Sequence, residues 1–364
     1  MSVKAEVLAI LEANREEHIS GEELASRLQV SRTSIWKAIK ALREEGYEIE
    51  AANNRGYCLP QTNDLLNEEG ISLYLNERAS GYPLEIYKIL DSTNTECKRR
   101  VIDGAPHGLT ILAEEQTGGK GRLGRNFYSP AKTGIYMSIL VHPAFDGNDA
   151  VLLTTAASVA VCRGIKEVLH KETQIKWVND IYLDGRKICG ILTEAISNFE
   201  MGKIDSAIVG IGINYRTEDF PEEIRDRAGS LEKNGEHIPR NQLVAAILNA
   251  FWEIYDTLES REFIKEYRER SMVIGQQVRL QENGEWKEAT ALDIDDNGGL
   301  IVQMEEADGQ ESTSNRRNYI TIKNGTAVKA IPFLFPRSNE PSADLSAFGD
   351  CRKGQTPRCL QRGI

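Results

Sequence analysis

The sequence has 364 residues, of which 40% are hydrophobic and 27% are charged. This length predicts two or three domains, and the composition is typical of a soluble globular protein. The N-terminus lacks an apolar signal region and no apolar run is long enough to cross a bilayer, so we expect a cytoplasmic protein without a membrane partner. The net charge of -11 argues against nonspecific coating of nucleic acid but allows a local basic element. Six scattered cysteines without metal-ligand spacing predict structural thiols and no zinc site.

The first 46 residues carry the signals of three short helices. Apolar residues recur at helical spacing over residues 3–13. Ser20 and Glu23 form a capping box for a second helix, and Ser31 caps a third over residues 32–45. Two short helices joined by a tight turn predict a helix-turn-helix unit.

A basic face on the third helix and the hairpin that follows it indicate a winged helix-turn-helix. The hairpin runs over residues 47–59, with a turn at residues 53–56. Such a unit places its third helix in the major groove of DNA, with phosphate contacts from Lys and Arg. The alternative is a winged helix used only for protein contacts. The candidate DNA-binding residues are Ser31, Arg32, Thr33, Ser34, Trp36, Lys37, Lys40, Arg43 and Arg55.

A short cationic segment over residues 115–127 holds four glycines, a lysine and two arginines. Its glycines match G-x-G-x-x-G, which indicates dinucleotide binding only when a strand precedes and a helix follows. Strands are predicted on both sides, over residues 109–113 and 135–141, and no helix follows. Backbone amides and guanidinium groups of such a loop suit an anion. A solvated connecting loop is the alternative.

Polar residues follow the predicted strand 84–89. Asp91 or Ser92 is placed to cap the next helix, and capping alone would explain both residues. Ser, Thr and Asn side chains at the start of a helix are equally suited to a small polar ligand. The sequence leaves these two interpretations open.

The region from residue 174 to residue 214 is predicted to be β-structure. A strand over 174–183 meets a return strand over 186–194 at Asp184-Gly185, a strong type I′ turn signal. Lys187 near this turn is either a solvated strand end or a catalytic lysine. Glycines in the apolar strand 205–214 allow a ligand or a packed helix to approach the backbone.

The remaining elements are predicted from periodicity and turn signals. Short strands separated by turns at 283–284 and 297–299 describe a small C-terminal β-barrel. The predicted helices cover residues 65–75, 150–169, 241–258 and 262–270, and residue 148 or 149 is the start signal of the second, a long apolar helix. The barrel strands cover 278–280, 286–294 and 299–304.

With its predicted elements and motifs in this order, the chain resembles a bacterial biotin protein ligase of the bifunctional repressor type. The resemblance runs from about residue 3 to about residue 310 and is carried by the motifs at 91–94, 116–125, 176–190 and 210–214. It implies a ligase that joins biotin to ATP, giving biotinyl-5′-adenylate, and transfers biotin to a lysine of a biotin carboxyl carrier domain. It also implies a repressor of biotin genes that binds operator DNA as an adenylate-bound homodimer.

The resemblance assigns roles to matching residues. Ser92, Thr93, Asn94 and Gln116 would bind the polar ring of biotin, and the basic loop would fold over the carboxylate and phosphate. Lys187 and Arg122 would be catalytic. Mg²⁺ would be carried by the ATP phosphates, with Asp180 as a candidate contact and no tightly bound metal. The remaining residues implied in biotin or adenylate binding are Gly119, Lys120, Gly121, Arg125, Phe127, Trp177, Asn179, Gly190 and Asn214.

Three positions depart from the family pattern. Lys120 stands where the family commonly has Arg, Phe127 where it has Trp, and Val178 where it has Pro. After about residue 310 the sequence no longer matches the strands that would close the barrel. The segment to residue 364 reads as disordered, and a shifted reading frame at the 3′ end of the gene is one hypothesis for it.

The predicted fold is an α+β multidomain protein. Its parts are a winged helix-turn-helix domain (1–62), a central mixed-sheet α/β domain of the biotin/lipoate ligase type (63–270), a small SH3-like β-barrel (271–322) and a disordered tail (323–364). Two alternatives to the bifunctional ligase remain. One is a ligand-sensing repressor with a weak or absent transferase site, and the other is a ligase for lipoate or another acid.

Overall fold

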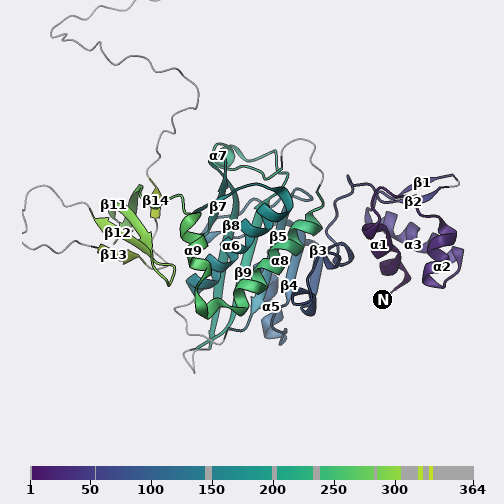
Figure 1. The fold of residues 1–364 in the computed structure, drawn as a ribbon, viewed down its shortest axis with the longest axis horizontal. Coiled ribbons are helices and arrows are strands. Elements are labelled where there is room, and N and C mark those ends of the chain that lie inside the picture. Colours follow the sequence, from purple (N-terminus) through teal and green to yellow (C-terminus); the bar gives the residue numbers. More distant parts are fainter. Residues whose placement is uncertain are drawn as a thin grey trace, which may run out of the picture. The chain divides into compact units, whose positions relative to one another are not determined.

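The computed structural model describes residues 2–53, 55–143, 150–198, 203–232, 238–282, 285–304, 319–322 and 328–330. The described residues form sheets of two, seven and five strands (Figure 1). No helix among them is both long and apolar enough to cross a membrane. The predicted helix start at 148 or 149, parts of the turns at 53–56 and 283–284, and the tail beyond residue 330 lie outside the described residues.

The N-terminal unit forms as its caps predict. Ser20 Oγ accepts a hydrogen bond from the amide of Glu23 at 3.0 Å, and Ser31 Oγ accepts one from the amide of Ser34 at 3.2 Å. These bonds satisfy amides that a helix start leaves unpaired. Three helices result: α1 (Val3–Ala13), α2 (Gly21–Leu28) and α3 (Arg32–Glu45).

The wing is a short antiparallel hairpin of β1 (Glu50–Ala52) and β2 (Gly56–Cys58). The prediction began its first strand at residue 47, but Tyr47 and Ile49 are buried in the core between the three helices. Burying these two side chains in the core removes apolar surface from water, which stabilises the protein more than extending the exposed hairpin would. The wing therefore begins three residues later than predicted.

The central sheet has the strand order β3-β4-β5-β9-β8-β7-β6 (Figure 1). β3 and β4 are parallel and are joined through helix α5 (Thr93–Ile102), and the other neighbours are antiparallel. The strands are β3 (Leu84–Leu90), β4 (Thr110–Gln116), β5 (Gly134–Val141), β6 (Gln174–Lys176), β7 (Asp180–Leu183), β8 (Arg186–Asn198) and β9 (Lys203–Asn214). This mixed sheet is the α/β core that the sequence predicted.

The two faces of the sheet are covered by different helices. Helices α6 (Ala150–Leu169) and α8 (Arg240–Asp256) pack side by side on one face, where they bury residues such as Leu112 (Figure 1). Successive strand residues point to opposite faces. Ile111 accordingly packs with Cys97 of α5 on the other face. That second face also carries the candidate site.

Two predicted elements differ in the structure. The helix predicted over 65–75 is reduced to α4 (Glu68–Ser72), because polar contacts hold residues 64–67 outside a helix. The strand predicted over 174–183 is interrupted by a turn at 177–179, which separates β6 from β7. The other helices among the described residues are α7 (Glu222–Arg225), α9 (Phe263–Glu269) and the short 3-10 turns η1 (Ala79–Gly81), η2 (Arg122–Gly124) and η4 (Leu258–Ser260).

The C-terminal strands form an open antiparallel sheet in the order β13-β12-β11-β10-β14. Within the described residues the outer strands β13 and β14 do not pair, so the predicted SH3-like barrel is not confirmed. β14 lies beyond residue 322, where the prediction ended this domain and began a disordered tail. The strands are β10 (Gln277–Glu282), β11 (Glu285–Ile294), β12 (Leu300–Met304), β13 (Tyr319–Ile322) and β14 (Val328–Ala330).

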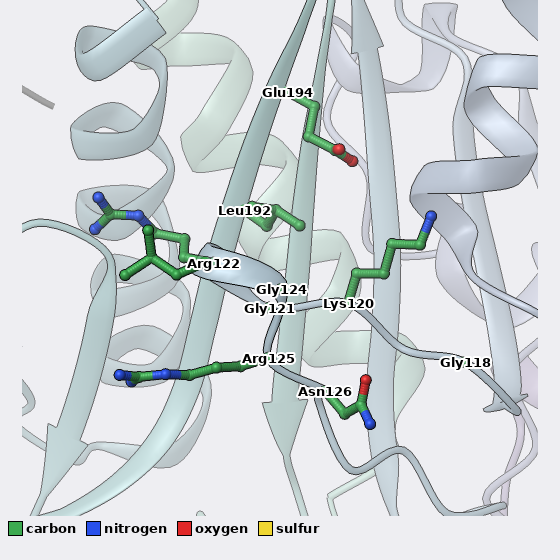
Figure 2. A pocket seen from close by; sticks show the side chains of 10 residues that line it. Gly118, Lys120, Gly121, Arg122, Gly124, Arg125, Asn126, Leu192 and Glu194 are labelled. Atoms are coloured by element: carbon green, nitrogen blue, oxygen red, sulfur yellow. The ribbon is translucent and has the colours of Figure 1, made fainter. Parts of the chain in front are cut away.

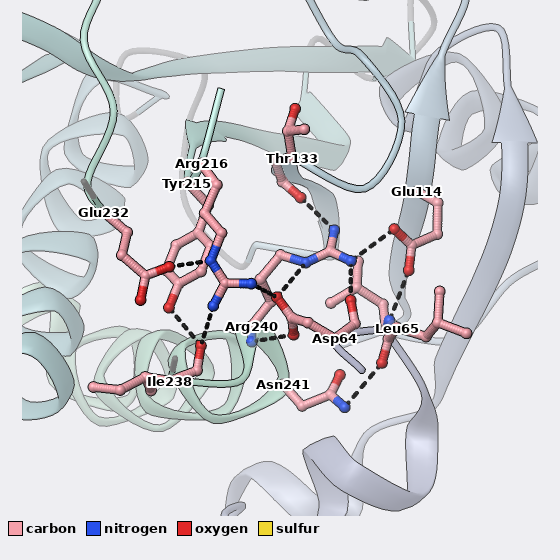
Figure 3. Close-up of polar contacts among 12 residues, drawn as sticks. Asp64, Leu65, Glu114, Thr133, Tyr215, Arg216, Glu232, Ile238, Arg240 and Asn241 are labelled. Atoms are coloured by element: carbon pink, nitrogen blue, oxygen red, sulfur yellow. Dashed lines mark hydrogen bonds and ion pairs between the residues drawn. The ribbon is translucent and has the colours of Figure 1, made fainter. Parts of the chain in front are cut away.

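A buried arginine fastens the segment before α4 to the central sheet (Figure 3). Arg240 is 0% exposed, and its Nη2 lies 2.8 Å from Glu114 Oε2 of β4. Its Nη1 donates to the carbonyl of Gly134 at 2.7 Å, and its Nε lies 3.2 Å from Asp64 Oδ2. The second oxygen of Glu114 accepts the amide of Leu66 at 2.7 Å. Buried charges are thus paired and hydrogen-bonded, as burial requires.

Candidate active site

Glycines in β8 and β9 open the sheet face next to α5. A Cβ at Gly210 would lie 2.1 Å from Asn94 Oδ1, and a Cβ at Gly212 would lie 2.6 Å from Phe127 Cε1. The side chains of Asn94 and Phe127 therefore lie directly against the backbone of β9. The glycines predicted to allow close approach do so here for residues of the chain itself.

The start of α5 supplies hydroxyl and amide groups. Ser92 occupies the N-cap position and is 2% exposed, but its side chain makes no capping hydrogen bond. Thr93 donates both its amide and its hydroxyl to Gln116 Oε1, at 2.8 Å and 3.1 Å. The predicted capping role of the Ser92 side chain is therefore wrong, and that hydroxyl is not committed to the helix. Asp91 is held instead by an ion pair with Arg99 at 2.6 Å.

The Gly-rich segment folds back on itself as a narrow loop between β4 and β5, as predicted. The amide of Phe127 donates to the carbonyl of Gly119 at 2.9 Å, and the amide of Gly121 donates to the carbonyl of Arg125 at 2.7 Å. At its tip Leu123 has φ 57° and is 65% exposed. No helix follows before β5, so the dinucleotide fingerprint is excluded.

The cationic side chains leave this loop in different directions. Lys120 extends away from Arg122 and Arg125 (Figure 2) and its Nζ lies 3.1 Å from Thr95 Oγ1. Arg122 Nη1 donates to Asn179 Oδ1 at 3.0 Å. Burial lowers the pKa of Arg122, although the charge of Asp180 opposes this shift. A partly desolvated guanidinium gains strongly from an anion brought against it.

Lys187 of β8 lies next to Asp180 of the neighbouring strand β7. Its Nζ is 2.6 Å from Asp180 Oδ1, and 32% of the lysine side chain remains exposed. The Asp184-Gly185 turn between their strands has φ values of 51° and 72°, which fit the predicted type I′ turn. A Cβ at Gly190 would lie 3.3 Å from Lys187 Nζ, so the ammonium group lies above this glycine. Lys187 is thus directed over the sheet face and is not a solvated strand end.

Two adjoining hollows bring these residues together. The larger, of about 610 Å³, lies under the Gly-rich loop and reaches Leu192 and Glu194 of β8 (Figure 2). The smaller follows the glycine floor. Predicted site residues that line it are Ser92, Thr93, Asn94, Gln116, Lys120, Gly121, Arg122, Phe127, Asn179, Lys187 and Gly190.

Five predicted site residues do not line the smaller hollow. Arg125 lines the larger one, Gly119 lies beneath Phe127 and Ser129, and Asp180 pairs with Lys187. Asn214 and Trp177 lie in neither hollow. Asn214 Nδ2 donates to the carbonyl of Gly229 at 3.1 Å, and Trp177, 5% exposed, donates its Nε1 to the carbonyl of Gly298 at 2.9 Å. Trp177 therefore packs in the core, and its part in ligand binding stays a prediction.

Three polar residues that the sequence reasoning missed complete the site. Ser138, fully buried in β5, lies 2.7 Å from Thr93 Oγ1 and 2.6 Å from Asn94 Oδ1. Ser129 accepts a hydrogen bond from Gln116 Nε2 at 3.0 Å. Glu194 accepts one from Asn94 Nδ2 at 2.8 Å. A serine within an otherwise apolar strand was the signal available for Ser138.

Glu194 is held by two cationic neighbours. Burial alone raises its pKa, but hydrogen bonds from Lys98 and Asn94 and the charges of Lys98 and Lys120 outweigh burial and place the pKa below its usual value. The carboxylate is therefore ionised at neutral pH, with Lys98 Nζ 2.7 Å from Oε1.

Most of the predicted DNA-binding residues are exposed in the N-terminal unit. Trp36 is 56% exposed, and Lys40 Nζ lies 5.7 Å from the centre of its ring. Arg43 donates through Nε and Nη2 to the carbonyl of Ile49, at 3.0 Å and 2.5 Å, and so fastens α3 to the segment just before the wing. The other exposed members of the set are Ser31, Arg32, Thr33, Lys37 and Arg55, and Ser34 is half-buried.

Comparison with known protein families places three profiles on the chain. The "Biotin/lipoate A/B protein ligase family" matches residues 86–214, an "HTH domain" matches residues 4–58, and the "Biotin protein ligase C terminal domain" matches residues 273–313. The fold and the site therefore define a biotin/lipoate-type ligase joined to a helix-turn-helix domain.

Individual relatives extend this match over most of the chain. The bifunctional ligase/repressor BirA of Bacillus subtilis is 35% identical over 311 residues, which cover 84% of this chain and 95% of the relative. The protein of the same name from Escherichia coli is 27% identical over 308 residues, covering 84% and 93%. Among solved structures, the biotin protein ligase from Aquifex aeolicus in complex with biotin and ATP aligns with a TM-score of 0.58 and 27% identity, covering 68% of this chain and 99% of that one. The chain belongs to the family of bifunctional biotin ligase/repressors.

Proposed function

We propose that the chain activates biotin with ATP and transfers it to a lysine of a biotin carboxyl carrier domain, and that it represses biotin genes through its winged helix-turn-helix. The observation that carries this proposal is the glycine floor beneath Phe127, bordered by polar groups of α5 and by Lys187 and Arg122. One end of this site suits a polar ring, and the other suits a carboxylate facing a phosphate.

The groups around the start of α5 bind the ring end of the substrate. Ser92 and Thr93 are buried and Gln116 is half-buried, and they present hydroxyl and amide groups where an unmatched polar atom costs free energy. A cyclic urea carries both N–H donors and a carbonyl acceptor and can match such groups. A dithiolane ring carries neither, which disfavours lipoate.

The cationic end carries the activation step. One carboxylate oxygen of biotin attacks the α-phosphorus of ATP, an acyl–oxygen–phosphorus bond forms, and pyrophosphate leaves. Negative charge accumulates on the oxygens around phosphorus in the transition state, and fixed cations offset it. Lys187, oriented by Asp180, and Arg122, oriented by Asn179, are the two side chains that provide this charge.

Magnesium enters this scheme with ATP. Within the described residues there is no group of three or more His, Cys, Asp and Glu side chains that could hold a metal ion. A divalent ion shared between phosphate oxygens needs one or two protein carboxylates at most. Asp180 is the carboxylate that could meet it, once Lys187 has turned towards the reacting oxygens.

The second step consumes the adenylate. The uncharged ε-amine of the carrier lysine attacks the acyl carbon, an amide bond forms, AMP leaves, and a proton is released. The Gly-rich loop over the larger hollow would shield the adenylate from water before the carrier arrives. Its exposed tip at Leu123 is the side that a carrier domain would meet first.

The adenylate-bound form is proposed to dimerise and bind operator DNA. Paired helix-turn-helix units read half-sites about one DNA turn apart, so repression through this domain calls for two copies. Trp36 and Lys37 are exposed residues of α3 that could meet base edges and phosphates. Sedimentation with biotin and ATP should give a dimer, and an unchanged monomer would contradict this part of the proposal.

A labelling assay tests the ligase activity. The protein is incubated with ATP, Mg²⁺, biotin and a carrier domain, and the carrier is probed with streptavidin. Lys187→Met should lower the rate at least about a hundredfold, since it removes a charge used in the transition state. Lys166→Met is the matched control, because that lysine pairs with Glu172 on the surface of α6 at 2.6 Å.

The outcomes separate the alternatives. Labelled carrier with wild type and a large loss with Lys187→Met support the proposal. No labelling, together with biotin-dependent DNA binding, would identify a ligand-sensing repressor with an inactive transferase site. Labelling of a carrier with lipoate in place of biotin would identify the other alternative.

A further inference from the structure

Asn94 lies at the centre of a row of residues that crosses the sheet. In the strand register Gly210 of β9 stands between Ser138 of β5 and Leu192 of β8. Asn94, 4% exposed, lies over Gly210 and reaches both neighbours. Its position is therefore set by three different strands, and its amide group has little freedom to move.

The hydrogen bonds of Asn94 have only one consistent orientation. Glu194 Oε2 lies 2.8 Å and the carbonyl of Leu192 lies 3.3 Å from Asn94 Nδ2. A carboxylate and a carbonyl accept hydrogen bonds but cannot donate them. The amide must therefore present its NH₂ group to Glu194, and its oxygen must face Ser138, 2.6 Å away.

This orientation decides where the proton of Ser138 goes. The amide oxygen of Asn94 only accepts, so Ser138 donates its single proton to it. Ser138 Oγ is also 2.7 Å from Thr93 Oγ1 and has no second proton to give. The proton of Thr93 goes to Gln116 Oε1, 3.1 Å away. The acceptor position of Thr93 Oγ1 that faces Ser138 is therefore filled only when Ser138 turns its single proton from Asn94 to Thr93.

The opposite arrangement would arise without the carboxylate. If Asn94 turned by half a revolution, its NH₂ group would face Ser138, and Ser138 would then donate to Thr93. The hydroxyl of Thr93 would lose an acceptor position in the hollow that it lines with Gln116. Glu194 is the ionised group that forbids this turn, and Lys98 holds its other oxygen at 2.7 Å.

We propose that Glu194 is a positioning residue which, through Asn94 and Ser138, keeps Thr93 Oγ1 available as a hydrogen-bond acceptor for an N–H group of the substrate ring. This inference rests on the proposed function, because it names how the same site recognises a cyclic urea. Glu194 acts on the substrate ring through Asn94 and Ser138, which its hydrogen bond to Asn94 orients. Its effect is on KM and on the choice of substrate, with kcat at saturating biotin little changed.

Two ring chemistries test the inference. The full chain is assayed with biotin and with a biotin analogue in which a cyclic carbonate replaces the urea, so that the carbonyl stays and both N–H donors are lost. Glu194→Leu should raise KM for biotin about tenfold, the effect of one hydrogen bond. Affinity for the carbonate analogue should change much less, so the preference for biotin shrinks. Glu172→Gln removes a surface carboxylate paired with Lys166 and should leave the preference unaltered.

A pair of substitutions guards against a folding defect. Asn94→Asp places two carboxylates side by side and should weaken biotin binding. Glu194→Gln in that background supplies an NH₂ group to Asp at position 94, whose other oxygen still accepts from Ser138. The double variant should therefore regain part of the preference for biotin that Asn94→Asp loses.

The results discriminate between the inference and the proposed function. If Glu194→Leu weakens biotin and the carbonate analogue equally, or if the double variant shows no recovery, the inference fails while biotin ligation by the wild type stands. If the wild type itself neither binds nor adenylates biotin, the proposed function fails and the inference falls with it.

Discussion

Replacing Arg240 with methionine should destabilise the central domain strongly. The side chain is 0% exposed and serves two carboxylates, those of Glu114 and Asp64, whose side chains are only 11% and 6% exposed. Methionine fills a similar volume but leaves both carboxylates without this partner (Figure 3). Removing one member of a buried ion pair costs about 3–5 kcal/mol, because the remaining charge stays buried and uncompensated. Asp64 keeps an ion pair with Arg216 at 3.1 Å, which favours the lower part of that range.

The loss can be measured as a change in Tm and in the urea midpoint. In a domain of this size 1 kcal/mol corresponds to about 2–4 °C, so Tm should fall by roughly 6–20 °C. Arg240→Lys keeps the charge but cannot reproduce the forked contacts, and it should fall between the wild type and Arg240→Met. Lys166→Met removes an exposed partner of Glu172, with side chains 57% and 66% exposed, and should stay within about 1 kcal/mol of wild type.

One result would refute this reasoning. If Arg240→Met were as stable as Lys166→Met, the cost of desolvating Arg240 would cancel its ion pairs, and the cluster would contribute nothing net to stability. An equal loss in Arg240→Lys and Arg240→Met would show instead that the geometry of the guanidinium matters and its charge does not.

Three further predictions concern the site, pH and DNA. Gly210→Ala should raise KM for biotin by at least about tenfold, since its Cβ would meet Asn94 at 2.1 Å. Gly81→Ala is the control and should behave as wild type in the same titration, because no atom lies within 4 Å of the added Cβ. Burial lowers the pKa of His107 below 6.5, so the unfolded chain binds a proton there before the folded chain does. The stability that His107 contributes is therefore complete above that pH and is lost below it, with a slope of at most about 1.4 kcal/mol per pH unit. The free energy of unfolding, measured with urea between pH 7.5 and pH 5, should fall less steeply with decreasing pH in His107→Gln, by up to that slope. Equal slopes in wild type and variant would count against a buried neutral imidazole. Lys37→Ala should reduce the dependence of log K on log salt for operator DNA by about one counterion, and an unchanged salt slope would exclude a phosphate contact at this residue.

Local signals in the sequence determined several parts of the molecule correctly. The caps at Ser20 and Ser31 and the turn at Asp184-Gly185 depend on atoms a few residues apart, so residue type alone specifies them. The same holds for the loop over residues 115–127, because Pro, Gly and charge patterning exclude a helix after it. The family resemblance then rests on ordered motifs, which a sequence carries directly.

Tertiary structure decided how these parts meet. β9 lies between β5 and β8, which are far apart in sequence, and only this order puts Gly210 beside Ser138 and Leu192. Asn94 and Glu194 are 100 residues apart, and neither pairing nor amide orientation follows from local sequence.

Long-range contacts also explain where the structure departs from what the sequence suggests. Trp177 carries the residue type of a ligand-stacking group, but burial of its large ring and a hydrogen bond to Gly298 O direct it into the core. The helix predicted over 65–75 has suitable periodicity, but Leu66 donates its amide to the Glu114 carboxylate and Asp64 just before it accepts from the backbone amide of Arg240. Residue types and short-range spacing thus determine elements and family, whereas long-range burial and charge pairing determine which side chains reach the site.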